Sequence, residues 1–312
     1  MELPINKTLA TEIILLGFTQ NWKINFALFP FILVIYIVTI VGNGFMVCVI
    51  IISPHLHTPM YVLLCNLSII DICYSTRTVP RFLVDLLSSS KRIPLAECVL
   101  QSYVGMYLGQ TEPLLFALMA FDRYVAICRP LRYVIIMRWS VCYRLIALVY
   151  LTSFTGTALP IILVRLVVCN PNEINHFTCE AQGGLKLSCY PISEVEFVTM
   201  LLTSSIIITP FILILLSYTA IISSILKLHS SGRSKAFSTC TSHVIVVSMF
   251  YGSAMVIFFT PLTQYTSDQE KYASVVNLIL MPMINPLIYS LKNKEVTKVF
   301  VLKKERIQSS FF

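Results

Sequence analysis

Seven long apolar runs, separated by short polar segments, constrain this 312-residue chain more than any other feature. The first run, residues 26–52, has no charged side chain and is long enough to cross a bilayer as a tilted helix. The other six are predicted at residues 60–87, 98–127, 142–164, 197–226, 237–262 and 272–291. Only 12% of the residues are charged, about half the fraction in a typical soluble domain, so lipid is the expected solvent. We predict an all-α membrane protein, a seven-transmembrane helix bundle.

Basic residues gather on one predicted side of the membrane. The segments after the third, fifth and seventh runs carry most of them, against only Glu295 and Glu305. The positive-inside rule therefore places the N-terminus outside and the C-terminus in the cytoplasm. The net charge of +8 is interpreted as this topogenic signal, so no nucleic-acid partner is expected.

Three parts follow from this topology: an extracellular tail at 1–25, a transmembrane domain at 26–291 and a short basic cytoplasmic tail at 292–312. The tail after the last run is expected to lie on the lipid surface. The start of the chain has no basic segment followed by a cleavage site, so we expect no cleavable signal peptide. The first run then targets the chain to the membrane.

Two weaker signals agree with the predicted orientation. Asn6 begins an Asn-Lys-Thr glycosylation sequon, which is used only on the lumenal side. Cys98, Cys169, Cys179 and Cys189 all fall on the same predicted outer face, where disulfides form. Four cysteines allow three pairings, and the spacing alone does not choose between them.

Two acids lie deep inside predicted spans, where ionisable groups are costly and therefore functional candidates. Asp71 in the second run and Glu112 in the third would share a cation or a proton if their helices are neighbours. The alternative is a hydrogen-bonded polar network with Asn43, Ser68 and Asn285 that only holds helices together. No nucleophile or metal-ligand cluster accompanies the acids, so an enzyme is not expected.

Two other kinds of site are not expected. His55 and His57 form a His-x-His pair without a third ligand nearby, which does not favour a metal site. Lys271 and Lys292 lie at the two ends of the seventh run, so its middle has no lysine for a Schiff-base chromophore.

A series of motifs carries a family resemblance. Residues 119–128 read Met-Ala-Phe-Asp-Arg-Tyr-Val-Ala-Ile-Cys. Others occur at 42–43 (Gly-Asn), 56–61 (Leu-His-Thr-Pro-Met-Tyr), 217–218 (Ser-Tyr), 235–243 (Lys-Ala-Phe-Ser-Thr-Cys-Thr-Ser-His), 250–252 (Phe-Tyr-Gly) and 282–293 (Pro-Met-Ile-Asn-Pro-Leu-Ile-Tyr-Ser-Leu-Lys-Asn). Together they resemble vertebrate olfactory receptors, a branch of the rhodopsin-like class A G-protein-coupled receptors, over nearly the whole chain. Phe121 and Asn277 depart from the family pattern, which has a tyrosine and commonly an aromatic residue there.

The resemblance assigns roles to several of these residues. Those expected to switch the helix bundle and contact a G protein are Asp122, Arg123, Tyr124, Tyr218, Asn285, Pro286 and Tyr289. Asp71 and Glu112 would connect the pocket to these switches around a sodium ion, with no other cofactor expected. The resemblance also pairs Cys98 with Cys179 and Cys169 with Cys189, so that an outer loop at about 167–194 covers the binding cavity.

The resemblance places the ligand pocket in the outer half of the bundle. The residues expected to line it are Gly105, Met106, Gly109, Gln110, Leu202, Thr203, Ile206, Tyr251, Ala254, Met255 and Phe258. This set is mainly apolar. It offers Gln110, Thr203 and Tyr251 as hydrogen-bond partners and contains no fixed charge, which favours a small, neutral, hydrophobic ligand.

The implied function is that of an odorant receptor in the plasma membrane of olfactory sensory neuron cilia. It would bind an apolar volatile molecule and activate a stimulatory heterotrimeric G protein, which raises cAMP. One alternative is an ion-coupled transporter, although no internal repeat is visible. Another is an intramembrane enzyme, which would need a nucleophile and base or a metal motif. The third is a receptor of the same type that responds to a non-odorant molecule.

Overall fold

The chain folds as a bundle of seven long helices in a computed structural model that describes residues 10–163, 168–169, 172–189, 193–227, 230–259 and 268–291. Six spans are single helices: α1 (Trp22–Ile52), α2 (Pro59–Leu87), α3 (Leu95–Cys128), α5 (Trp139–Leu163), α7 (Ser193–Ile225) and α8 (Ser230–Phe259). The seventh is made of α9 (Asp268–Val275), a π-helical turn (Val276–Leu280) and α10 (Met281–Leu291). The fold class predicted from the sequence is thereby confirmed.

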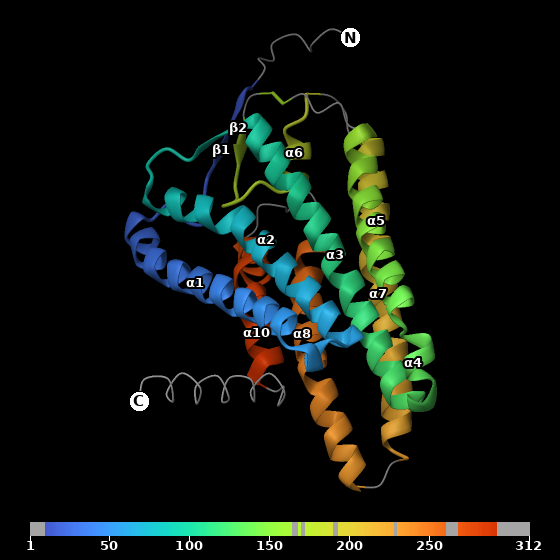
Figure 1. Cartoon of the computed structure of the whole chain (residues 1–312). Coiled ribbons are helices and arrows are strands. Elements are labelled where there is room, and N and C mark those ends of the chain that lie inside the picture. The colour runs from blue at the N-terminus through green and yellow to red at the C-terminus, as the bar shows by residue number, and fades with distance from the viewer. Residues whose placement is uncertain are drawn as a thin grey trace, which may run out of the picture.

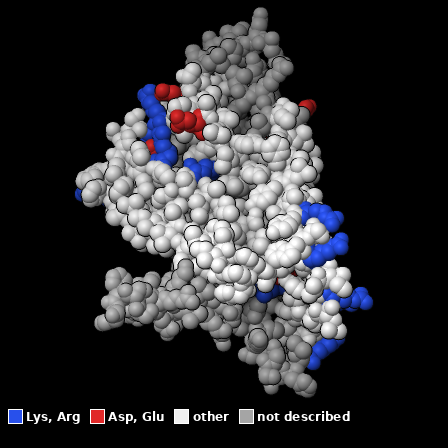
Figure 2. All heavy atoms as spheres, in the orientation of Figure 1, with Lys and Arg blue, Asp and Glu red and all other residues white. Residues whose placement is uncertain are grey.

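Six of these spans in the described chain are long and apolar enough to cross a membrane by length and composition. The remaining one, α3, carries Glu112, Asp122 and Arg123 along its length. Many apolar side chains face outward, and Phe26 and Phe31 of α1 are more than 60% exposed. Figure 2 shows the same separation on one face, where charged side chains lie toward the ends and an uncharged band lies between them.

Helix packing follows the order expected for such a bundle. α1 packs on α2 and α10, and α3 packs on α2, α5 and α7. The main core forms where these helices meet, around Leu115, Phe116 and Met119, none of which has measurable exposure. α3 therefore runs through the centre of the molecule, and its side chains reach most of the other helices.

Several helices extend past the apolar runs that predicted them. α3 begins at Leu95 rather than Cys98, α7 at Ser193 rather than Phe197, and α8 at Ser230 rather than Phe237. The added turns contain Glu97 and Glu194. Backbone hydrogen bonding continues a helix beyond the point at which its side chains stop being apolar, so hydropathy marks the membrane band and not the helix end.

A small three-stranded sheet covers one end of the bundle, which we call the lid end. It contains β1 (Glu12–Leu15), β2 (Arg92–Pro94) and β3 (Glu173–Ile174) in the order β2-β1-β3. β1 runs antiparallel to β2, with Ile13 opposite Ile93, and parallel to β3. Part of the segment 1–25 that was expected to form a tail is therefore paired, and Ile13 is only 1% exposed.

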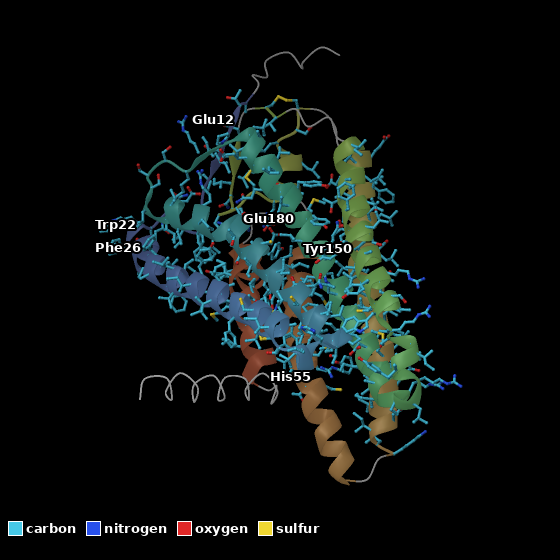
Figure 3. All side chains as sticks on the ribbon, in the orientation of Figure 1. Glu12, Trp22, Phe26, His55, Tyr150 and Glu180 are labelled. Atoms are coloured by element: carbon cyan, nitrogen blue, oxygen red, sulfur yellow. A yellow bond between two sulfur atoms is a disulfide. The ribbon has the colours of Figure 1, made fainter. Side chains whose placement is uncertain are left out.

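The opposite end of the bundle, which we call the α4 end, carries the short helix α4 (Tyr133–Ile136) between α3 and α5 (Figure 1). In Figure 3, Glu12 lies at the lid end and His55 at the α4 end. The predicted glycosylation site at Asn6 and the basic tail at 292–312 lie outside the described residues.

Candidate functional site

A cavity opens between the upper halves of the helices, beneath the lid end. It encloses about 920 Å³ of space between atoms, part of it open to solvent. Its walls come from α2, α3, α7, α8, the seventh span and the segment at Cys179–Ala181. A mainly apolar lining with a few polar groups suits small organic ligands.

Six of the residues expected from the resemblance line this cavity. They are Gly105, Met106, Gly109 and Gln110 of α3, Thr203 of α7 and Ala254 of α8. The four α3 residues share one face because positions one, four and five residues apart lie side by side on a helix.

Four of the expected residues lie elsewhere. Met255 is 46% exposed on the outside of α8, and Leu202 is half-buried outside the cavity wall. Ile206 lies against Gly156 of α5. Tyr251 is buried, but its hydroxyl donates to the carbonyl oxygen of Ile207 at 3.3 Å and its ring packs on Phe211. The side chain of Phe258, also expected in the pocket, is outside the described part of the chain.

The expectation of a pocket without fixed charge is wrong. Arg77 of α2 and Glu180 of the lid both line the cavity. The sequence contained a signal for Arg77, since it is a charged residue inside an apolar run. The residues expected from the resemblance lie on α3, α7 and α8. None lies on α2, so the expected set leaves out this side of the cavity.

Arg77 joins α2 to α3. Its Nη1 donates to the backbone carbonyl of Gln101, and the Gln101 amide nitrogen donates back to the Arg77 carbonyl at 3.0 Å. The Gln101 side-chain oxygen accepts from the backbone N–H of Cys179 at 2.9 Å. This chain of contacts ties α2, α3 and the lid together beside the cavity.

Glu180 is held from the other side. Its Oε1 accepts from Ser274 Oγ of α9 at 3.1 Å and lies 3.7 Å from His176 Nε2. Figure 3 shows Glu180 among the helices beneath the lid end. His176 is 2% exposed and stacks on Phe177. Burial lowers the pKa of His176, although the nearby Glu180 carboxylate opposes that shift.

Gln110 presents a polar group at the deep end of the cavity. Its Oε1 accepts from Thr157 Oγ1 of α5 at 3.2 Å. Its Nε2 is buried and has no hydrogen-bond partner among the described residues. An unsatisfied buried donor in a cavity wall is suited to a ligand oxygen.

Asp71 and Glu112 lie below the cavity. Asn285 Nδ2 is 3.1 Å from both carboxylate oxygens of Asp71, and the Asp71 and Glu112 charges are close enough to interact. Glu112 Oε1 is buried without a hydrogen-bond partner in the described chain. Asn43 donates instead to the carbonyl oxygen of Pro282 at 2.7 Å, so it links α1 to α10.

Several of the residues expected to switch the bundle lie toward the α4 end, whereas Asn285 lies on Asp71 below the cavity. Asp122 Oδ1 accepts from Tyr133 Oη of α4 at 2.8 Å, and Arg123 Nε is buried without a partner among the described residues. Tyr218 Oη lies 2.7 Å from His243 Nδ1. The buried Tyr289 hydroxyl also has no partner in the described chain. The sequence places His243 only within the motif at 235–243 and does not predict its contact with Tyr218.

Tyr124 and Pro286 of the switch set make other contacts. Tyr124 packs on Phe121 with ring centroids 6.4 Å apart, and Pro286 is buried within α10. Pro286 Cγ stands opposite Gly42 of α1, where an added Cβ would meet it at 3.3 Å. The small residue at position 42 therefore allows α1 and α10 to approach closely.

Both disulfides implied by the resemblance are present in the structure. Cys98 of α3 bonds to Cys179, and Cys169 bonds to Cys189. The first attaches the lid to the beginning of α3, and the second closes the segment that contains β3 and α6 (Ala181–Lys186). Cys179 is fully buried and lines the cavity, so the bridge fixes one of its walls.

Comparison with known proteins gives consistent matches. The sequence matches a family model described as olfactory receptor over residues 32–304. It is 43% identical to human Olfactory receptor 13C2, covering 93% of this chain and 94% of that one. It is 44% identical to mouse Olfactory receptor 2B6, covering 95% of each. The fold is similar to squid rhodopsin, with a TM-score of 0.66 at 17% identity, covering 92% of this chain and 87% of that one.

Proposed function

Because this chain belongs to the olfactory receptor family, we propose that it binds small, mostly apolar odorants in the cavity and activates a stimulatory heterotrimeric G protein, which raises cAMP. The chain is a signalling receptor and not an enzyme. The observation that carries the proposal is the cavity itself, which has an apolar wall with a few convergent polar groups beneath a disulfide-anchored lid.

The lid end faces the outside of the cell in this proposal and the α4 end faces the cytoplasm. Arg138 and Arg144 follow the α4 segment, as the positive-inside rule requires of a cytoplasmic loop. The disulfides then lie in the oxidising compartment. The receptor sits as a multi-pass protein in the plasma membrane, with olfactory cilia as the proposed site of action.

The coupling surface is the α4 end. A bound agonist shifts the bundle only if it prefers one helix arrangement over another. Arg123 is the proposed centre of this change, because its charge is close enough to interact with Tyr218 and Tyr289. Movement of α8 would separate His243 from Tyr218 and free the Tyr218 hydroxyl for Arg123 and a G protein.

A sodium ion is proposed between the cavity and this switch. Asp71 and the orphaned Glu112 oxygen supply the hard oxygen ligands that such a cation prefers. When bound, the ion would offset one of the two buried negative charges. Replacing sodium by choline should lower the thermal stability of the purified receptor, and the Asp71→Asn variant should lose this dependence. Equal stability in both salts would contradict the sodium proposal.

The function is tested by recording cAMP in cells that express the receptor with a stimulatory G protein, across a panel of small volatile molecules. Arg123→Ala should abolish the response at unchanged surface expression. Ala254→Phe should weaken it by filling the cavity, whereas Met255→Phe, on the exposed face of the same helix, should not. Well-expressed receptor that stays silent to the whole panel would point to a non-odorant ligand or another transducer.

A further inference from the structure

The cavity wall holds a guanidinium group that makes no ion pair with a carboxylate of the described residues. The ion pairs of the described residues join Arg81 to Asp85, Arg92 to Glu12 and His176 to Glu180, and none includes Arg77. Burying a charge at membrane depth is costly unless it is paired. An unpaired arginine in the wall of a cavity is therefore a candidate for pairing with a ligand.

The guanidinium is already held in position. One N–H group of Nη1 is used by the Gln101 carbonyl, and Cζ lies 5.3 Å from the centre of the Tyr74 ring. The Nε atom is buried and makes no hydrogen bond within the described chain. Arginine has five N–H donors arranged to match a carboxylate, so several remain for a ligand. Fixing the side chain beforehand reduces the entropy that binding would cost.

Gly105 permits this placement. A Cβ at position 105 would overlap Nη1 and Cζ of Arg77, so the guanidinium lies directly against the α3 backbone. Any side chain larger than hydrogen would push the charge away from the cavity wall. The pairing of Gly105 with Arg77 thus brings a positive charge to the face of α3 that contains Met106 and Gly109.

The Glu180 charge acts on Arg77 through space, but the two make no ion pair among the described residues. Glu180 is bound to Ser274 on α9 and lies near His176 in the lid. Its negative charge repels an anion from the lid side of the cavity and leaves the approach to Arg77 as the favourable one. The two charges therefore orient an anionic ligand with its acidic end toward α2.

Much of the rest of the wall is apolar. Met106, Ile207, Phe250, Ala254 and Leu278 line it, with Gln110, Thr203 and Asn277 as polar exceptions. From Gly105 to Gln110 the helix rises roughly 7–8 Å, which is room for an aliphatic chain of roughly five to seven carbons. The cavity thus combines one cationic group with a large apolar surface.

We propose that this receptor recognises small aliphatic carboxylates, with the guanidinium of Arg77 bound to the carboxylate and the chain packed against Phe250 and Leu278. This inference rests on the proposed function, since it names the ligand class of the same cavity. A carboxylate bound in a bidentate manner by arginine gains both affinity and a fixed orientation.

The test is direct binding to the purified receptor, measured by ligand-induced thermal stabilisation, so that it does not depend on G-protein coupling. The ligands are straight-chain carboxylic acids of four to nine carbons, each compared with the carboxamide, primary alcohol and primary amine of the same chain length. The acids should stabilise the wild-type receptor at concentrations roughly 10–100-fold lower than their carboxamides do. This comparison requires no variant.

Arg77→Gln should remove the advantage of the acids and leave binding of the alcohols unchanged, and Arg77→Lys should keep part of it. Arg81→Gln is the matched control, because Arg81 is on the same helix and is paired with Asp85 outside the cavity. Equal binding of acids and carboxamides, a preference for amines, or an Arg77→Gln variant that keeps its preference for acids would overturn the inference. None of these outcomes would by itself contradict an odorant response in the cAMP assay.

Discussion

The hydroxyl of Tyr218 lies 2.7 Å from Nδ1 of His243, and the two rings stack with their centroids 5.7 Å apart. Tyr218 is on α7 and His243 on α8, so this hydrogen bond joins the two helices in the half of the bundle nearer α4. His243 is 1% exposed and also contacts the edge of the Phe116 ring on α3. Three helices thus meet at one imidazole.

Removing the Tyr218 hydroxyl should destabilise the receptor. Tyr218→Phe would leave Nδ1 of His243 buried without a partner, and Nε2 already has none in the described chain. An unsatisfied buried acceptor costs about 1–3 kcal/mol. We expect a lower midpoint of thermal unfolding for the purified variant in detergent.

A double-mutant cycle separates this bond from general packing. Tyr218→Phe, His243→Leu and the combination should show a coupling free energy of about 1 kcal/mol, because the second substitution no longer breaks a bond. If the two losses simply add, the hydrogen bond contributes nothing to stability and the rings alone hold the helices.

The contact between Asn285 and Asp71 should show a different pattern. Asn285→Ala removes the donor that lies 3.1 Å from both Asp71 oxygens and leaves a buried carboxylate without that support. The cost should be about 2–3 kcal/mol, because hydrogen bonds to charged groups are the stronger ones. Asp71→Asn keeps an acceptor at the same place without a charge to bury, so it should cost less than about 1 kcal/mol.

Chemical denaturation or thermal unfolding of the two single variants, side by side in the same detergent, checks this ordering. Both should be measured in sodium-free buffer, so that ion binding does not contribute. A larger loss for Asp71→Asn than for Asn285→Ala would mean that the negative charge itself stabilises the fold.

The membrane fold could be read from the sequence because its signal is strong. Long apolar runs have few alternatives to a spanning helix, and the run at 26–52 lies within α1 (Trp22–Ile52). The N-terminal strand was not predicted. Ile13 and Leu15 form β1 only because β2 and β3 supply the pairing, and four residues carry little periodicity of their own.

The candidate site could be predicted best on α3, although Thr203 of α7 and Ala254 of α8 also line the cavity as expected. Four residues of α3 reach the cavity as expected, since helical spacing fixes their common face. On α7 and α8 the faces were misjudged by one position or more, so that Met255 points outward and Ile207 rather than Ile206 lines the wall. Neighbouring residues on a helix point about 100° apart, and the rotation of each helix is set by tertiary packing.

The lid should lose stability as the pH falls. Burial lowers the pKa of His176, and the charges of Lys271 and Arg77 lower it further against the opposing effect of Glu180. The unfolded chain therefore binds a proton at higher pH than the folded one does. His176 contributes its full share of stability above a pH of about 6.5, and this share decreases as the pH falls below that value.

Thermal unfolding of the purified receptor between pH 7.5 and pH 5.5 checks this effect. The wild type should lose more stability across this range than His176→Gln, which has no proton to bind. Glu180→Gln is a useful comparison, because it removes the opposing charge and should enlarge the loss. Parallel pH profiles for the wild type and His176→Gln would show that other groups control the acid sensitivity.

Gly105→Ala should disturb the receptor more than Gly109→Ala or Gly44→Ala does. Its Cβ would overlap the Arg77 guanidinium, so either α2 moves from α3 or the charge leaves its position, at a cost of about 1–3 kcal/mol. At Gly109 the nearest atom is Tyr74 Oη at 3.1 Å, which a small ring shift accommodates, and at Gly44 nothing lies within 4 Å. Gly44→Ala should therefore be neutral or stabilise α1 by up to about 1 kcal/mol, since alanine favours a helix. Unfolding midpoints that rank the three variants in any other order would place the Arg77 side chain away from Gly105.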